Sequence, residues 1–143
     1  MYERILVAYN ASTQSTIALR EAVEMARVSQ GELHVLAVVP TAGSFTTVEL
    51  GGPLDVQGTV LNRVQQALDA VSNDLMEQGI GVQSNVRQGD PADEIIASAY
   101  RLKADLVVIG HSKKGVLARW LQGSMGAKLL SELPCSLLIA SVR

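Results

Sequence analysis

The sequence predicts an α/β fold, an open doubly wound parallel sheet of five strands in the order 3-2-1-4-5 with helices on both faces. Short apolar runs rich in β-branched residues recur along the chain, which is typical of strands covered on both faces. Amphipathic segments separate these runs, and such alternation favours parallel strands joined by helices. A chain of 143 residues suits one domain, so we expect residues 1–143 to form a single unit.

Four of the expected strands are apolar almost throughout, and they cover residues 5–8, 35–39, 106–109 and 137–140. The segment 82–87 is different, because apolar Val82 and Val86 alternate with polar neighbours. Alternation of this kind indicates a half-exposed strand at the edge of the sheet.

Helices are expected between the strands. The first covers residues 12–29 with Ser12 as its N-cap, and the second covers residues 60–76, where apolar side chains recur every three or four residues. Asp90 and Pro91 open a third, which ends near residue 102, as a capping Asp and a first-turn Pro favour. A fourth begins near residues 123–124.

The stretch 41–58 is the long irregular part of the sequence, rich in Gly and Thr. A connection of this length is either an exposed insertion or a lid over a site.

Composition makes several classes of function improbable. A formal net charge of −2 and an aromatic content of 3% disfavour nucleic-acid binding. Cys135 is the single cysteine, so an internal disulfide or a cysteine metal cluster is impossible, and we expect a small buried hydrophobe there. The N-terminal residues lack a signal-peptide pattern, and no apolar run approaches the roughly 20 residues of a membrane span. We therefore expect a cytoplasmic protein.

A ligand site is expected where the strand order reverses, beyond the carboxyl ends of the first and fourth strands. The loops at residues 9–12 and 109–112 would face each other there. Gly123 and Ser124 then open a helix, whose free N–H groups suit phosphate oxygens.

At this point the sequence resembles a known family from end to end. The segments ILVAYNAS, LAVVP, GDPADEI and PCSLLIA are similar to corresponding segments of universal stress proteins. Residues 110–124 resemble the ATP-binding signature of that family, which reads G-x-x-G, nine residues, then G-[S/T]. The match is incomplete, because Lys113 replaces the second glycine and Asn10 replaces the aspartate of the first loop.

The resemblance implies an adenine nucleotide, ATP, ADP or AMP, with or without Mg²⁺. It assigns Val38 and Ile109 to the adenine wall and Asn10 to the ribose. The phosphates fall to Gly110, Gly123 and Ser124, and the remaining lining residues are Ala8, His111, Lys113 and Met125.

Lys113 is the departure with the larger physical consequence. A lysine at a left-handed position costs about 1–2 kcal/mol, although its ammonium could itself bind phosphate.

Two kinds of function compete. The first is a nucleotide-binding, dimeric stress-response or regulatory module, and its alternative is a dimeric interaction protein of the same family that binds no nucleotide. A flavodoxin-like enzyme or electron carrier is disfavoured. Such a protein would need a phosphate loop rich in Ser, Thr and Gly after the first strand, and residues 10–13 are too short a segment to form one. No catalytic base can be assigned, so any ATP hydrolysis would be slow. His34 and His111 lie far apart in the sequence and predict no metal site.

The last strand predicts an assembly. In the expected order it is an edge strand, yet residues 137–140 are apolar throughout. A bare apolar edge invites pairing, so we expect a homodimer through Ser136 to Ser141, as the family resemblance also implies.

Overall fold

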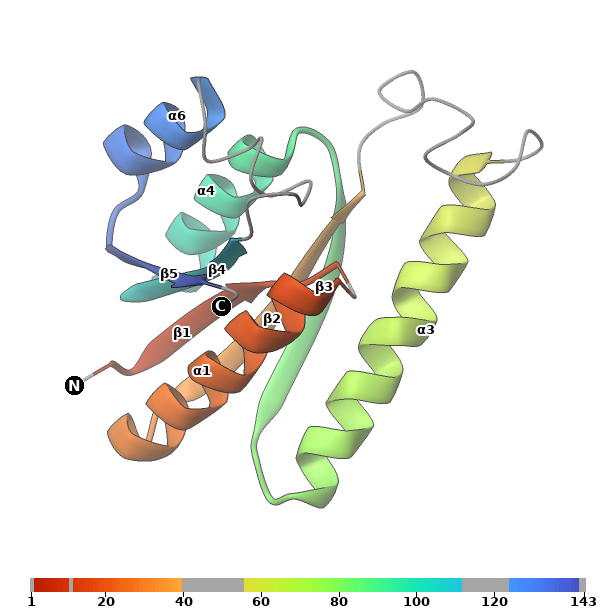
Figure 1. Ribbon diagram of the computed structural model, residues 1–143, viewed down its shortest axis with the longest axis vertical. Helices are drawn as coiled ribbons and strands as arrows, with labels where there is room; N and C mark the ends of the chain where they lie inside the picture. The colour runs from red at the N-terminus through yellow and green to blue at the C-terminus, as the bar shows by residue number, and fades with distance from the viewer. Residues whose placement is uncertain (1, 11, 40–55, 112–123, 142–143) are drawn as a thin grey trace.

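A five-stranded parallel sheet forms the centre of the computed structural model, which describes residues 2–10, 12–39, 56–111 and 124–141. The strands are β1 (Arg4–Ala8), β2 (Glu32–Val39), β3 (Val82–Gln88), β4 (Leu106–His111) and β5 (Ser136–Ser141). Their order is β3-β2-β1-β4-β5, so the order expected from the sequence is confirmed (Figure 1).

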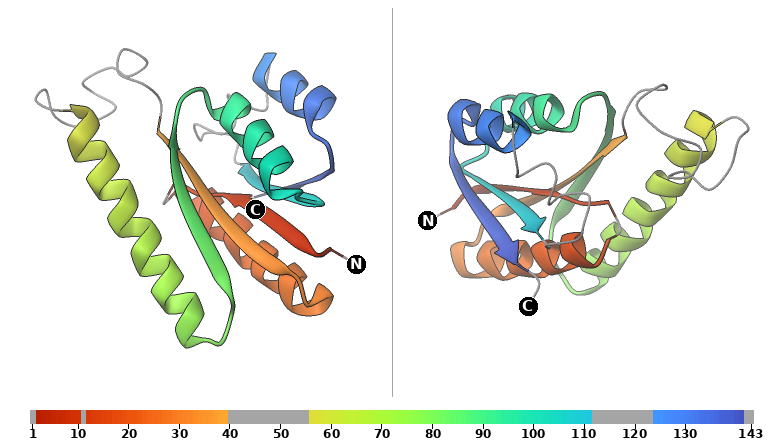
Figure 2. Two further views of the ribbon diagram at one scale, coloured as in Figure 1. Left: turned by 180° about the vertical axis from the view of Figure 1, so that it is seen from behind. Right: turned by 45° about the horizontal axis from the view of Figure 1, so that its top comes forward.

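Helices cover both faces of the sheet. Helices α1 (Thr13–Ser29) and α3 (Val56–Glu77) lie on one face, and α4 (Pro91–Leu102) and α6 (Ser124–Glu132) lie on the other (Figure 2). Among the described residues, no helix combines the length and the apolar character that crossing a membrane would need.

Each central strand supplies both halves of the core, because successive side chains of a strand point to opposite faces. In β1, Ile5 and Val7 pack toward α1 and α3, whereas Leu6 and Ala8 pack toward α4 and α6. Side chains buried on both faces explain why the central strands read as unbroken apolar runs. The edge strand β3 is instead half-exposed, as its alternating sequence predicted.

The starts of two helices agree with the prediction from the sequence. The Ser12 side chain accepts a hydrogen bond from the backbone N–H of Ser15 at 3.2 Å, and that of Asp90 accepts one from Asp93 at 3.0 Å. Both residues are N-caps, and Pro91 occupies the first turn of α4.

Some boundaries differ from the expectation. Strand β2 begins at Glu32, three residues before the apolar run, because its polar first residues still pair with β1 and β3. Strand β4 continues to His111, where Gly110 and His111 pair with β5. Helix α3 begins at Val56, inside the stretch expected to be irregular, and residues 40–55 lie outside the described part of the chain.

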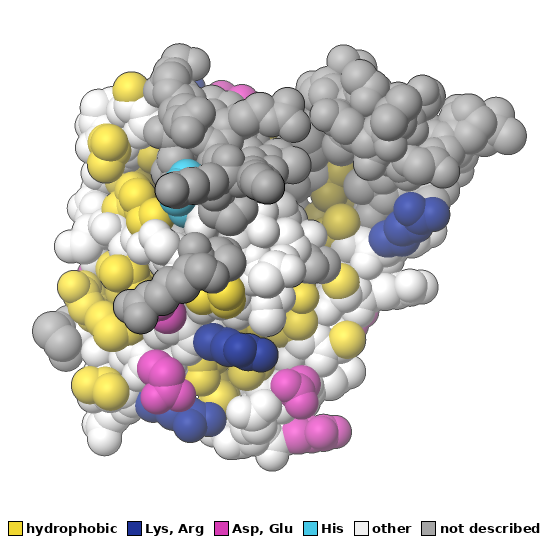
Figure 3. All heavy atoms as spheres, in the orientation of Figure 1, with side chains coloured by type: hydrophobic (Ala, Val, Ile, Leu, Met, Phe, Trp, Pro, Cys, Tyr) yellow, Lys and Arg dark blue, Asp and Glu magenta, His cyan; other side chains and the backbone are white. Residues whose placement is uncertain are grey.

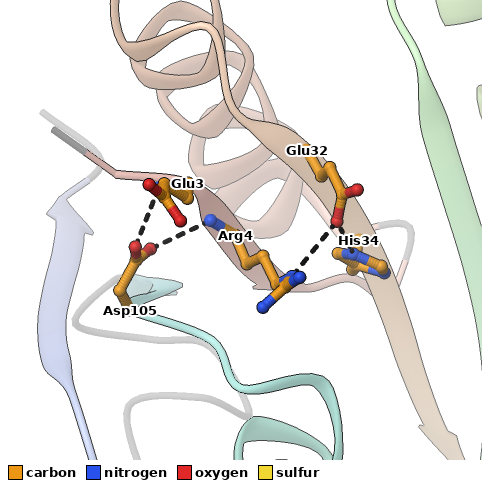
Figure 4. A network of polar contacts seen from close by, with 5 residues as sticks. All are labelled: Glu3, Arg4, Glu32, His34 and Asp105. Carbon is orange, nitrogen blue, oxygen red and sulfur yellow. Dashed lines mark hydrogen bonds and ion pairs between the residues drawn. The ribbon is translucent and has the colours of Figure 1, made fainter.

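A network of polar contacts connects the amino ends of β1, β2 and β4 (Figure 4). The carboxylate of Asp105, just before β4, accepts hydrogen bonds from the backbone N–H groups of Glu3 at 2.8 Å and Arg4 at 3.1 Å. The Glu32 carboxylate lies 3.4 Å from both the Arg4 guanidinium and the buried His34 ring. His34 is therefore a buried residue of the sheet that contacts the neighbouring Glu32 carboxylate.

Replacing Asp105 tests this fastening. Asp105→Ala removes the acceptor of two backbone N–H groups, so the free energy of unfolding should fall by about 1–2 kcal/mol in urea denaturation. Asp69→Ala is the control, since Asp69 is exposed on α3 and accepts a hydrogen bond from the Gln65 side chain of the same helix. Equal loss in the two variants would contradict a fastening role for Asp105.

Candidate functional site

The candidate site lies at the carboxyl ends of β1 and β4, the neighbouring strands between which the order reverses. After β1 the chain enters α1 on one face, whereas α6, the next helix that the described residues contain after β4, packs on the other. A change of face between neighbouring strands marks the usual place of a ligand crevice in α/β sheets.

Three of the expected wall residues share one face of the sheet. Ala8, Val38 and Ile109 belong to the cluster that packs beneath α4 and α6. Ile109 is 0% exposed and Ala8 is 7% exposed, whereas Val38 is half-buried. Val38 is thus the one of the three with substantial free surface.

Gly110 is required by packing. A Cβ atom at this position would overlap the backbone carbonyl group of Gln14 and lie 3.1 Å from the backbone nitrogen of Ser15. The first turn of α1 therefore rests directly on the last residues of β4. The sequence pattern assigned Gly110 to phosphate binding, but the contact with α1 is sufficient reason for a glycine here.

Asn10 is built into the start of α1. Its side-chain oxygen accepts hydrogen bonds from the backbone N–H of Ser12 at 3.1 Å and from the Ser12 hydroxyl. Its own backbone N–H donates to the Ser15 hydroxyl at 3.2 Å. Asn10 is exposed, and its side-chain oxygen is engaged by Ser12.

The remaining expected residues are placed only in part. His111 is half-buried at the end of β4, and its Nδ1 atom is buried without a hydrogen-bond partner among the described residues. Lys113 and Gly123 lie outside the described residues, as do the side chains of Ser124 and Met125. Helix α6 nevertheless begins at Ser124, as the sequence predicted.

Helix α6 is held against α4 by both an apolar and a polar contact. Leu129 is 1% exposed in the shared core, and the Lys128 ammonium donates a hydrogen bond to the carboxylate of Asp93. This hydrogen bond raises the pKa of Lys128. The pair joins the middle of α6 to the first turn of α4, on the face of the sheet that carries Ala8 and Val38.

Sequence reasoning missed one basic residue near the site. Arg63 of α3 lines a hollow of about 170 Å³ together with Tyr9, Asn10, Val64 and Ala67. Arg63 is the sole basic residue in the amphipathic stretch 60–76, which is the signal that could have singled it out. It brings a positive charge to the Asn10 side of the crevice.

A separate groove of about 580 Å³ lies between α1 and α3. Leu19, Val23 and Leu75 line it and are nearly buried, while Arg20 and Asp74 are among its charged lining residues. Figure 3 shows hydrophobic, basic and acidic side chains mixed on this part of the surface. Because both signs of charge are present, the groove has no clear electrostatic preference.

The described residues contain no group of three His, Cys, Asp or Glu side chains that could hold a metal ion. Cys135 precedes β5 at the amino end of the sheet, away from the crevice. Cys135 is half-buried rather than buried as expected, and burial, followed by the charge of Asp105, raises the pKa of its thiol.

Comparison with known proteins decides the family. The model of the universal stress protein family matches residues 1–141. The chain belongs to this family. A curated relative, universal stress protein MJ0531 of Methanocaldococcus jannaschii, is 28% identical over 140 residues, which is 97% of this chain and 82% of the relative.

Solved structures share the fold. UspA from Lactobacillus plantarum has a TM-score of 0.73 and 23% identity, with 97% of each chain covered. A family protein from Arabidopsis thaliana with AMP bound has a TM-score of 0.70 and 20% identity, covering 99% of this chain and 92% of that one. A protein from Archaeoglobus fulgidus in complex with dAMP has a TM-score of 0.66 and 18% identity, covering 96% and 97%.

The packing role of Gly110 can be measured directly. Gly110→Ala should lower the free energy of unfolding by about 3 kcal/mol, because the added methyl group meets backbone atoms that cannot move aside alone. Gly81→Ala is the matched control, since no atom lies within 4 Å of a Cβ built there. A Gly110→Ala protein as stable as the control would refute the close approach of α1 and β4.

Proposed function

We propose that this universal stress protein binds an adenine nucleotide in the crevice between the β1 and β4 loops. The observation that carries the proposal is the reversal of strand order at Asn10 and His111, with α6 beginning beyond β4. Helix amino ends favour phosphate oxygens, and α6 begins at the Ser124 of the signature. Relatives with AMP or dAMP bound support the same ligand class.

The proposed contacts follow from the sequence and the fold together. Val38 offers an apolar surface to the base, above buried Ala8 and Ile109. Asn10 offers its amide nitrogen to the sugar, since its oxygen already accepts two hydrogen bonds from Ser12. We assign the phosphates to the segment from Gly110 to Ser124, with Met125 and the Lys113 ammonium beside them. ATP, ADP and AMP all suit this arrangement, and the proposal assigns no catalytic residue.

A second function is favoured by a specific observation. The Asn10 oxygen is engaged by Ser12, so it is not free to accept hydrogen bonds from ribose hydroxyls or to bind Mg²⁺. A family member that has lost the ability to bind a nucleotide would act through protein contacts alone. Titration with AMP and ATP separates the two functions.

Calorimetric titration of nucleotide-free protein with AMP and ATP, with and without Mg²⁺, tests the proposal. We expect binding in the micromolar range, and we expect Gly123→Asp to abolish it because a carboxylate there would repel the phosphates. Gly81→Asp, remote from the crevice, should bind as the unaltered protein does. The absence of both heat and thermal stabilisation at millimolar nucleotide would leave the interaction protein as the function.

We also propose that β5 pairs with the β5 of a second copy. Ile139 is 41% exposed on this edge strand, although Ala140 beside it is buried. An exposed apolar edge of this kind is protected in stable proteins by a partner strand.

A charge at Ile139 tests the pairing. Ile139→Lys should convert a dimer into a monomer in sedimentation velocity, because two ammonium groups would face each other across the shared edge. Val28→Lys, at a position 74% exposed on α1, should sediment like the unaltered protein. A dimer that persists in Ile139→Lys would place the interface elsewhere.

A further inference from the structure

A further pocket, distinct from the hollow beside Asn10 and the groove between α1 and α3, lies at the edge of the sheet opposite β5. It has a volume of about 540 Å³, and its lining comes from the carboxyl end of β3, from α3 and from α4. Arg87, Glu94, Leu61, Val86 and Asn62 are among its lining residues. A volume of this size accommodates a small metabolite.

Arg87, a half-buried residue, brings a positive charge to this pocket. Its Nε atom is buried and has no hydrogen-bond partner in the described part of the chain. No described carboxylate lies within ion-pair distance of its guanidinium. Because arginine stays charged at all physiological pH values, a buried donor without a partner is destabilising and calls for an explanation.

Glu94 brings a negative charge to the same pocket from the first turn of α4. Its carboxylate folds back over Gly89, where a Cβ atom would lie 2.9 Å from Glu94 Oε1. No described basic group, Arg87 included, is within ion-pair distance of it. Two opposite charges therefore line one pocket without neutralising each other.

We propose that this pocket binds a free amino acid with an apolar side chain. The ligand carboxylate would accept from the Arg87 guanidinium, whose planar fork matches a carboxylate, and the ligand ammonium would donate to Glu94. Leu61 and Val86 offer apolar surface to the ligand side chain. The Asn62 amide can both donate to and accept from the polar groups of the ligand.

Simple ions fit the pocket less well. An inorganic anion on Arg87 would also face the Glu94 carboxylate, and a simple cation on Glu94 would face the Arg87 guanidinium. A zwitterion instead offers a negative group to Arg87 and a positive group to Glu94. Since Arg87 pairs in register with Val38 of β2, the pocket adjoins the proposed nucleotide crevice but uses different polar groups.

The experiment is a calorimetric titration of the full chain with L-leucine, compared with two analogues that each lack one charge. Isopentylamine has no carboxylate, and 4-methylpentanoate has no ammonium. We expect saturable binding of L-leucine, and binding at least about tenfold weaker for each analogue, because each loses one charge-assisted hydrogen-bonded pair.

Variants assign the binding to the two charges. Arg87→Gln and Glu94→Gln should each weaken L-leucine binding at least about tenfold. The controls Arg20→Gln in α1 and Glu77→Gln at the last residue of α3 each remove one charge of the same sign from outside the pocket lining and should bind normally. Thermal unfolding of each variant confirms that it is folded.

Three outcomes would overturn the proposal. The first is no saturable binding of L-leucine. The second is equal binding of L-leucine and 4-methylpentanoate, together with tighter binding in Glu94→Gln, which would identify a plain anion site. The third is binding that both glutamine variants retain, which would place the ligand in another part of the molecule.

Discussion

The close approach of α1 to β4 is the contact on which the rest of the site depends. It exists because Gly110 has no side chain, so the backbone of Gln14 can rest on the strand. The hydrogen bonds of Ser12 and Ser15 with Asn10 then fix the helix start to the end of β1. One small residue thus sets how closely the start of α1 approaches the end of β4.

Much of the fold could be predicted from the sequence, because buried parallel strands and amphipathic helices leave strong local patterns. The order of the strands, the edge character of β3 and the caps Ser12 and Asp90 were all predicted correctly. The start of β2 at Glu32 was not, because polar residues that pair with neighbouring strands resemble a loop. The start of α3 at Val56 was also missed, because its first turn contains Gly58 and glycine is typical of loops rather than helices.

The site was less predictable than the fold, because it depends on contacts between distant segments. Motif spacing assigned Gly110 to a ligand, whereas only the three-dimensional structure reveals the helix that rests on it. Arg63 approaches Asn10 from a helix more than fifty positions later in the sequence, and no local pattern connects them. The same limit hides the pocket of Arg87 and Glu94, whose charges are informative only once both are known to face one space.

The polar network at the amino ends of the strands has a consequence for how such a protein can diversify. Asp105, Arg4 and Glu32 connect the strands at the end of the sheet opposite the candidate site. The described residues at the carboxyl ends of the strands do not share these contacts, so a substitution there leaves them intact, although Gly110 is constrained by its own contact with α1. A lineage can therefore exchange one ligand for another, or abandon its ligand altogether, while inheriting the same scaffold.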